Sequence, residues 1–237
     1  MVRKDLIKKY FSRFSKTYCR EAYIQKKTAK DLIDFGRELI YGIGVDLGSG
    51  TGYIADFLKD KNISIINIDL SRDMLKAVEF GINIQGDIEN LPFKDNSFNF
   101  VISSFSLHWT DLNKSFKEIS RILSKNGNFL LAIPVKDSLK FINFLLNENK
   151  FNFLSEDIVI DTLKGNSLTV RDYKIVEYYQ SFKNGYHFLK HLHQTGVSIN
   201  TSDKSFKEKK YIVNKFKSWE NNCFINYRLI FLKGSKA

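Results

Sequence analysis

The first residues of the chain alternate apolar and basic positions with a helical spacing. Residues 4–14 place Leu, Ile, Tyr and Phe side chains three and four positions apart, with Lys and Arg on the other faces. This spacing predicts a basic amphipathic helix. A second helix is predicted over about Tyr23 to Leu39, ending near the turn-prone pair Tyr41-Gly42.

From Ile43 onward, short apolar runs alternate with helical periods. The runs predict five buried strands, at Ile43–Leu47, Ile63–Leu70, Asn83–Ile84, Phe98–Ser103 and Phe129–Ile133. Between them, helices are predicted at Tyr53–Lys59, after an N-cap at Ser71, and at Leu112–Leu123, which is followed by a turn over residues 125–127. Such alternation is typical of a parallel sheet covered on both faces. The predicted fold class is α/β, with a doubly wound, mostly parallel, seven-stranded sheet of Rossmann-like type.

The pattern loosens beyond Pro134. A segment rich in Phe, Leu, Asn and Lys reaches about Leu154, and a helical stretch covers Tyr186–Thr195. We expect Tyr173–Phe182 and Tyr227–Leu232 to be late strands that close one sheet edge, with the helical stretches forming a cap. The whole chain, 1–237, is then one domain. It comprises helices over 1–40, a ligand-binding core over 41–135 and a C-terminal half over 136–237.

Composition narrows the class of protein. The chain has 237 residues, 43% of them hydrophobic, which is enough for a full core without disulfides or metals. The two cysteines, Cys19 and Cys223, form no metal-binding motif and fit a reducing cytoplasm. No apolar stretch has the length of a membrane span. The net charge of +11 favours an acidic partner, but no nucleic-acid motif accompanies the scattered lysines.

The segment Asp46–Gly52 carries the strongest chemical signal. Gly48, Gly50 and Gly52 follow a strand end at every second position and precede a helix. Glycine permits positive φ and a close approach of ligand to backbone, and the helix N-terminus offers free N–H groups. The spacing is GxGxG, whereas dinucleotide folds use GxGxxG. Asp46 suits a ligand that carries positive charge, such as S-adenosylmethionine, and a purely structural glycine turn is the alternative.

Two further acids lie at or just after the ends of the next two strands. Asp69 stands at the distance where an acid accepts hydrogen bonds from ribose hydroxyls, or where it simply caps the next helix. Asp87 is placed to receive an adenine amino group, with Ile88 covering the ring. Three acids at successive strand ends line one crevice of a doubly wound sheet. Together they indicate S-adenosylmethionine, with S-adenosylhomocysteine as product.

These segments resemble the methyltransferase family of the UbiE and BioC type. The resemblance rests on residues 46–52, 69–75, 86–93 and 98–104, and it implies a class I methyltransferase fold with Ser49, Leu70, Met74 and Ser103 at the cofactor. Residues 11–25, with Tyr18 and Gln25, are similar to the opening of the BioC branch, the malonyl-acyl-carrier-protein O-methyltransferases of biotin synthesis. Residues 103–109, 189–197 and 227–234 are similar to later segments of that branch. Ser49 and His108 depart from it, where cysteine and glutamine are usual.

The resemblance implies methyl transfer to the malonyl carboxylate on an acidic acyl carrier protein. A carboxylate is already ionised at neutral pH, so this reaction requires no general base and depends on positioning and desolvation. Arg13 and Tyr18, carried by an N-terminal helix acting as a lid, are the candidates for orienting the acceptor, with His108 beside them; core packing of this helix with a solvated Arg13 is the alternative. His187 and His191 lack the carboxylate of a metal-binding motif, so no metal site is expected. Two other functions stay open: transfer to another small acid or quinone precursor, and a non-catalytic assembly factor that binds the cofactor.

Overall fold

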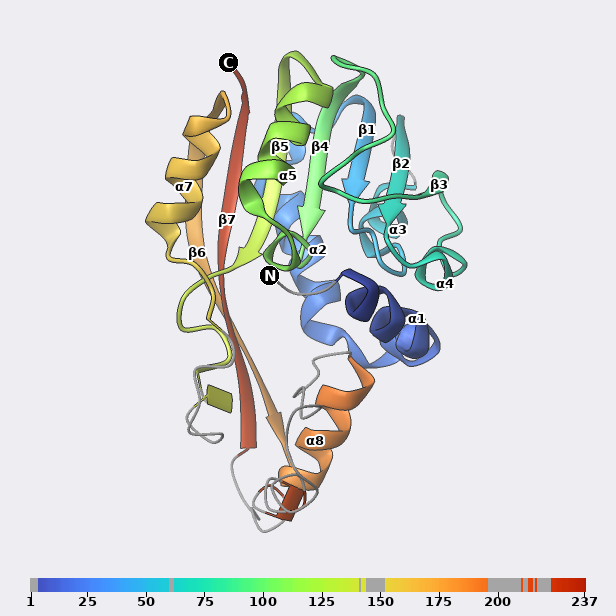
Figure 1. The fold of residues 1–237 in the computed structure, drawn as a ribbon, viewed down its shortest axis with the longest axis vertical. Coiled ribbons are helices and arrows are strands. Elements are labelled where there is room, and N and C mark those ends of the chain that lie inside the picture. Colours follow the sequence, from blue (N-terminus) through green and yellow to red (C-terminus); the bar gives the residue numbers. More distant parts are fainter. Residues whose placement is uncertain are drawn as a thin grey trace.

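A single seven-stranded sheet forms the centre of the protein (Figure 1). The computed structural model describes residues 4–59, 62–140, 142–143, 152–195, 210, 213–214, 216 and 223–237. Along the sheet the strands follow the order β3-β2-β1-β4-β5-β7-β6. Their bounds are β1 Gly42–Leu47, β2 Ile63–Asp69, β3 Ile82–Gln85, β4 Phe98–Ser104, β5 Leu123–Pro134, β6 Leu168–Phe182 and β7 Cys223–Lys236.

The first five strands pair in parallel, and β7 lies antiparallel between β5 and β6. This confirms the predicted fold class, including the two late strands at one sheet edge. The helices are α1 Lys4–Glu21, α2 Tyr23–Phe35, α3 Tyr53–Leu58, α4 Arg72–Leu75, α5 Leu112–Ile122, α7 Glu156–Gly165 and α8 Gly185–Gln194, with short 3₁₀ turns η1 Arg37–Leu39 and η2 Leu107–Trp109.

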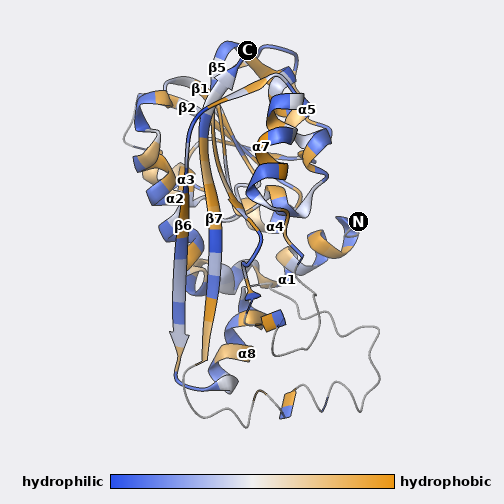
Figure 2. Cartoon of the chain, turned by 90° about the vertical axis from the view of Figure 1, so that its left-hand side faces the viewer, coloured by the Kyte–Doolittle hydropathy of each residue, from blue (hydrophilic) through white to orange (hydrophobic). Residues whose placement is uncertain are grey.

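Two hydrophobic layers cover the sheet, one on each face (Figure 2). Side chains of successive strand residues point to opposite faces, and β5 shows this directly. Leu130 and Ala132 pack in the layer that contains α2 and α3, whereas Phe129 and Leu131 pack in the layer that contains α5 and α7. The sheet is thus buried on both sides, as its nearly continuous apolar strands predict.

The ligand end of the sheet is covered by α1. The carboxyl ends of β1, β2 and β4 point toward this helix (Figure 1). Its apolar side chains follow the predicted spacing, but the helix continues to Glu21, seven residues beyond the predicted end. Tyr18 therefore belongs to the same rigid helix as the basic N-terminal turns.

Several predicted boundaries were wrong for local reasons. The second helix ends at Phe35, because Gly36 leaves the helical conformation and the chain continues as the 3₁₀ turn η1. Residues 125–127 were predicted as a turn, but they belong to β5. Asn126 takes a φ of 62° there, and the register against β4 shifts, so a strand irregularity accommodates these turn-prone residues.

The helix α7 was not predicted. Its sequence, EDIVIDTLKG, mixes β-branched and acidic residues, and only Val159 and Leu163 are buried. Two buried positions four residues apart give a weak periodic signal. Residues 141 and 144–151 of the segment predicted to reach Leu154 lie outside the described residues, as do residues 196–197 of the C-terminal resemblance.

Candidate functional site

The glycine turn is anchored to its neighbours on both sides. The Gly48 and Ser49 amides donate hydrogen bonds to the Ile68 carbonyl of β2, at 2.8 and 2.9 Å. Gly48 has a φ of +74°, and a Cβ there would lie 2.2 Å from the Ser106 Cβ, so this position requires glycine. On the other side, the Ser103 and Ser106 hydroxyls both donate to the Leu47 carbonyl. The turn is therefore held in one conformation before any ligand arrives.

Asp46 is a buried carboxylate without a partner. The residue is 1% exposed, and neither carboxylate oxygen has a hydrogen-bond partner among the residues described. Burial, and to a lesser degree the negative charge of Asp69, raises the pKa of Asp46 well above its usual value. A buried acid is costly unless a donor or cation satisfies it. Asp46 also lines the cavity, so a cationic ligand would supply what the protein does not.

Asp69 has structural partners and lines the cavity as well. Its Oδ2 accepts a hydrogen bond from the Gly50 amide at 2.9 Å, and its Oδ1 accepts one from the Ser71 amide at 2.7 Å. Ser71 in turn caps α4, as predicted, by accepting from the Met74 amide. Burial raises the pKa of Asp69, and the two amide hydrogen bonds oppose this rise. Asp69 therefore does help to fix the start of α4, which was the structural alternative. Its carboxylate oxygens still have free lone pairs that a ligand could use.

Asp87 is bridged to α1. The Lys4 ammonium on α1 contacts Asp87 Oδ2 at 2.7 Å and Glu89 Oε2 at 2.8 Å. Glu89 is additionally held by the Asp111 amide at 3.0 Å. Lys4 therefore fastens α1 to the segment that follows β3, directly over the predicted adenine end of the site.

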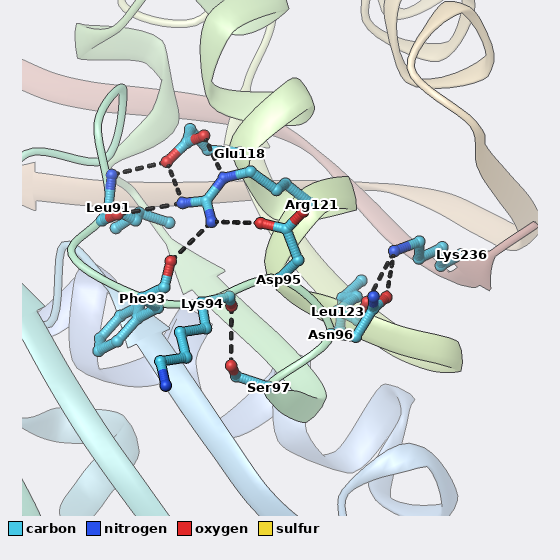
Figure 3. A network of polar contacts seen from close by, with 10 residues as sticks. All are labelled: Leu91, Phe93, Lys94, Asp95, Asn96, Ser97, Glu118, Arg121, Leu123 and Lys236. Atoms are coloured by element: carbon cyan, nitrogen blue, oxygen red, sulfur yellow. Dashed lines mark hydrogen bonds and ion pairs between the residues drawn. The ribbon is translucent and has the colours of Figure 1, made fainter.

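A polar network clamps the chain that follows Asp87 (Figure 3). The Arg121 guanidinium on α5 donates to Glu118, to Asp95 and to the carbonyls of Leu91 and Phe93. Glu118 also accepts from the Leu91 amide at 2.7 Å. This network fixes residues 91–95, and so limits where the preceding Asp87 and Ile88 can lie.

One cavity joins these strand ends and α1. The space within it, including the part that is open to solvent at its mouth, is about 950 Å³. The residues predicted at the site that line it are Asp46, Gly48, Ser49, Gly50, Asp69, Leu70, Met74, Asp87, Ile88 and Tyr18. The structure thus brings together the strand-end acids, the glycine turn and α1.

Four predicted site residues lie elsewhere. Gly52 is buried against Val78 and has a φ of +90°. The Ser103 hydroxyl forms hydrogen bonds with the Leu47 carbonyl and the Ser106 hydroxyl. Arg13 is exposed, with its guanidinium 5.6 Å from the Phe14 ring, and does not line the cavity. His108 packs against Phe105, Trp109 and Phe153, and burial lowers its pKa to about 3. It is therefore neutral at physiological pH, and it is not among the residues that line the cavity.

Other lining residues were not among the site residues assigned from the sequence. Lys4, Ile7, Lys8 and Phe11 come from α1, Gln25 and Ala29 from α2, Tyr53 and Ile54 from α3, and Ser71, Gly86, Ser104, Phe105, Ser106, Trp109 and Thr110 from the loops and strand ends. Most are apolar or small residues whose sequence signal is that of core packing. The resemblance at Gln25 was the one signal that could have placed it here.

Other chemistry is limited in the part of the chain that the structure describes. No group of three His, Cys, Asp or Glu side chains there could hold a metal ion. His191 is buried against Phe182, in agreement with a helix-packing role. Cys19 and Cys223 are unpaired, and no described helix is long and apolar enough to cross a membrane.

Comparison with known sequences agrees with this geometry. Residues 45–131 match the model of a family described as a methyltransferase domain. A protein of Methanocaldococcus jannaschii, named as uncharacterized protein MJ1123, is 32% identical over 68% of this chain and 79% of its own length. The malonyl-[acyl-carrier protein] O-methyltransferase of Hamiltonella defensa is 30% identical over 59% of this chain and 56% of its length.

A third relative has a different name. The rat mitochondrial arginine-hydroxylase NDUFAF5 is 35% identical over 49% of this chain. The match covers 35% of that protein, so this chain spans about a third of it. Among solved structures, the YcgJ protein of Bacillus subtilis superposes with a TM-score of 0.63 at 18% identity, covering 89% of this chain and 98% of that one.

Fold and site together define a Rossmann-like protein that binds a cationic nucleoside at the carboxyl ends of its parallel strands. Residues 45–131 form a methyltransferase domain, and the chain has the fold of the class I S-adenosylmethionine-dependent methyltransferases. S-adenosylmethionine is its cofactor. The buried, unpartnered Asp46 carboxylate fits the positive charge of that molecule, and the acids Asp69 and Asp87 beside apolar Leu70 and Ile88 fit its nucleoside part.

Removal of the Lys4 ion pairs should speed release of the cofactor product. Lys4 joins α1 to Asp87 and Glu89 but is itself 36% exposed, so the pairs contribute about 1 kcal/mol or less. We expect Lys4→Met to raise the dissociation rate of S-adenosylhomocysteine about two- to fivefold in stopped-flow fluorescence. Added salt should speed release from the parent more than from the variant. Lys9→Met is the control, because Lys9 is on the same helix but does not line the cavity. Equal dissociation rates in Lys4→Met and the parent would show that the Lys4 ion pairs do not slow release of S-adenosylhomocysteine.

Proposed function

We propose that the protein is a carboxylate O-methyltransferase whose acceptor is the malonyl group carried by an acyl carrier protein. The observation that carries this proposal is the change of chemistry along the cavity. Asp46 and Asp69 lie at the carboxyl ends of β1 and β2, and Asp87 follows β3. The carboxyl end of the next strand, β4, contributes Ser104 and Phe105 instead. The acids therefore serve the cofactor, and the acceptor meets a neutral, largely aromatic region beyond β1.

This neutral region lacks an effective base among the described lining residues. Ring contacts join Trp109 to Phe11, Phe11 to Tyr18 and Tyr18 to Tyr53, and these residues line the cavity together with Gln25. Burial is the main cause that raises the pKa of Tyr18 well above its usual value and that of Tyr53 to about 12, so both hydroxyls stay protonated. An acceptor that needs no deprotonation suits such a site, and a carboxylate meets that requirement.

The chain's own residues then have three tasks. Asp46 and the glycine turn hold the cofactor, α1 excludes water, and the Tyr18 hydroxyl orients the acceptor by donating a hydrogen bond. When bound, S-adenosylmethionine supplies an electrophilic methyl group. One carboxylate oxygen gives the electron pair of the new O–CH₃ bond, the S–CH₃ pair returns to sulfur, and no proton moves.

Charge supports an acidic protein as carrier of the acceptor. The chain has a net charge of +11, and Lys8 on α1 lines the cavity. Long-range attraction of this kind accelerates docking of an acidic partner. The resemblance of residues 11–25 to the malonyl-acyl-carrier-protein enzymes, and the similar enzyme of Hamiltonella defensa, support the same acceptor.

A transfer assay with labelled S-adenosylmethionine tests the proposal. Malonyl-acyl carrier protein, malonyl-CoA and free malonate are offered in parallel, and we expect a base-labile methyl ester on the carrier-bound substrate in the largest amount. Raising salt from 50 to 300 mM should slow transfer to the carrier protein more than transfer to malonyl-CoA. Labelling of free malonate alone, or equal salt dependence for both substrates, would contradict an acyl carrier protein as the carrier of the acceptor. Labelling of none of the three substrates would contradict a malonyl carboxylate as the acceptor.

A further inference from the structure

A pair of polar side chains lies at the neutral end of the cavity and has no role in the reaction described so far. Gln25 on α2 is 8% exposed and lines the cavity. Tyr227 on β7 is 4% exposed and is not among the lining residues, but its ring lies edge to face with that of the lining residue Phe105, with 5.0 Å between the ring centroids. Both are polar groups in a buried, aromatic setting, and such groups are expected to be hydrogen-bonded.

The Tyr227 hydroxyl is poorly satisfied by the protein. It has no partner of good hydrogen-bond geometry among the described residues. Burial raises the pKa of Tyr227 strongly, and the nearby Gln25 amide opposes that rise. The two groups are therefore close enough to interact, although not in full hydrogen-bond geometry. A hydrogen bond from the Tyr227 hydroxyl to the Gln25 amide oxygen would leave the amide N–H groups for a ligand in the cavity.

A neighbouring tyrosine shows what a satisfied hydroxyl looks like in this fold. Tyr178 pairs with Tyr227 across β6 and β7. Its hydroxyl donates to Asp31 Oδ2 on α2 at 2.8 Å. Two tyrosines at one register position thus meet the same helix, one on an acid and the other on an amide that faces the cavity.

We propose that Gln25 binds the acceptor by donating its amide N–H to a carbonyl oxygen, and that Tyr227 positions that amide. The inference rests on the proposed function, in which the acceptor is a thioester whose carbonyl lies two carbons from the reacting carboxylate. A neutral amide suits this carbonyl, since a cation there would compete for the carboxylate itself. Gln25 thus determines specificity for the thioester, and Tyr227 acts through Gln25.

Steady-state kinetics on three single variants and one double variant test this assignment. Gln25→Met keeps the length of the side chain and removes the amide, and Tyr227→Phe keeps the ring against Phe105 and removes the hydroxyl. Tyr178→Phe is the matched control, because it removes a hydroxyl that points away from the cavity. We expect Gln25→Met to raise the KM for malonyl-acyl carrier protein at least tenfold, and Tyr227→Phe at least threefold, with kcat within about twofold of the parent.

Cofactor affinity and coupling separate this role from a structural one. The Kd of S-adenosylhomocysteine, measured by titration calorimetry, should stay within twofold in every variant. The double variant Gln25→Met/Tyr227→Phe should match Gln25→Met alone, because a positioning residue has no effect once its target is gone. Unchanged KM in Gln25→Met, or a Kd that changes in parallel with KM, overturns the assignment.

Failure of the proposed function would look different. The parent would then label none of the malonyl acceptors, and calorimetry of malonyl-CoA binding to the complex with S-adenosylhomocysteine would replace the KM. Weaker binding in Gln25→Met than in the parent supports the carbonyl contact even then. Equal binding, or none in the parent, overturns it.

Discussion

Asp46→Asn is expected to stabilise the cofactor-free protein and to weaken cofactor binding strongly at the same time. The Asp46 carboxylate is buried and has no partner in the part of the chain that the structure describes, so its charge is a cost that the free protein bears. Asparagine has nearly the same shape and no charge. Relief of about 1–2 kcal/mol corresponds to a rise in Tm of roughly 2–8 °C for a chain of this size. The affinity for S-adenosylmethionine should fall at least a hundredfold.

Two measurements check this prediction. Calorimetric unfolding without ligand gives the change in Tm, and titration calorimetry gives the change in Kd. Asp161→Asn is the control, because that acid is exposed and its ion pair with Lys164 is long, at 3.8 Å. The control should shift Tm by less than 1 °C and leave Kd unchanged. A lower Tm in Asp46→Asn would show that the carboxylate has a stabilising partner in the free protein.

The same residue makes cofactor affinity depend on pH. Burial raises the pKa of Asp46 above its usual value of 3.8, so the unfolded state binds fewer protons than the folded one. Any stability linked to this group is therefore present at low pH and is lost as pH rises through the folded pKa. A cationic ligand favours the ionised form, so affinity should fall as pH is lowered toward 5. Calorimetry in buffers of different ionisation enthalpy should show proton release on binding by the parent and less by Asp46→Asn.

Sequence patterns predicted the site best where its chemistry is local. The glycine turn and the acids at the ends of β1, β2 and β3 are adjacent in sequence to the strands that place them. Parallel strands bring their carboxyl ends to one edge, so the order of strands and acids along the chain is enough to assign Asp46, Asp69 and Asp87 to one crevice. Their shared position in the cavity follows from the strand order.

Contacts between distant segments could not be predicted in this way. Lys4 and Asp87 are 83 positions apart, and nothing in the basic N-terminal helix distinguishes Lys4 from its other lysines. Arg13 looked suited to the acceptor by its place in a family motif, but the direction of a side chain depends on how α1 docks. Arg121 had the pattern of a solvated residue at a helix end. Its role depends on carbonyls of residues 91 and 93, which only the folded loop presents.

Arg121→Ala should produce the largest loss of stability among the substitutions considered. Its guanidinium holds two carbonyls and two acids, and its removal leaves Glu118, whose side chain is 15% exposed, without its main partner. Breaking a largely buried, hydrogen-bonded pair costs about 3 kcal/mol, which corresponds to a fall in Tm of roughly 6–12 °C. Arg121→Lys keeps the charge but not the fork of donors, so an intermediate loss is expected. Arg37→Ala removes an exposed ion pair and should cost less than about 0.5 kcal/mol.

Arg121→Ala should also weaken cofactor binding about tenfold at temperatures where the variant is folded, because residues 91–95 support the segment that carries Asp87 and Ile88. Arg121 lowers the pKa of Glu118 below its usual value of 4.5. The stability from this pair is therefore present above that pH and is lost as pH falls, so the difference in Tm between parent and variant should shrink near pH 4. Thermal scans at pH 4 and 7 with titration of S-adenosylhomocysteine measure both effects. A large fall in Tm with an unchanged Kd would mean that the clamp stabilises α5 and its loop without positioning the adenine end of the site.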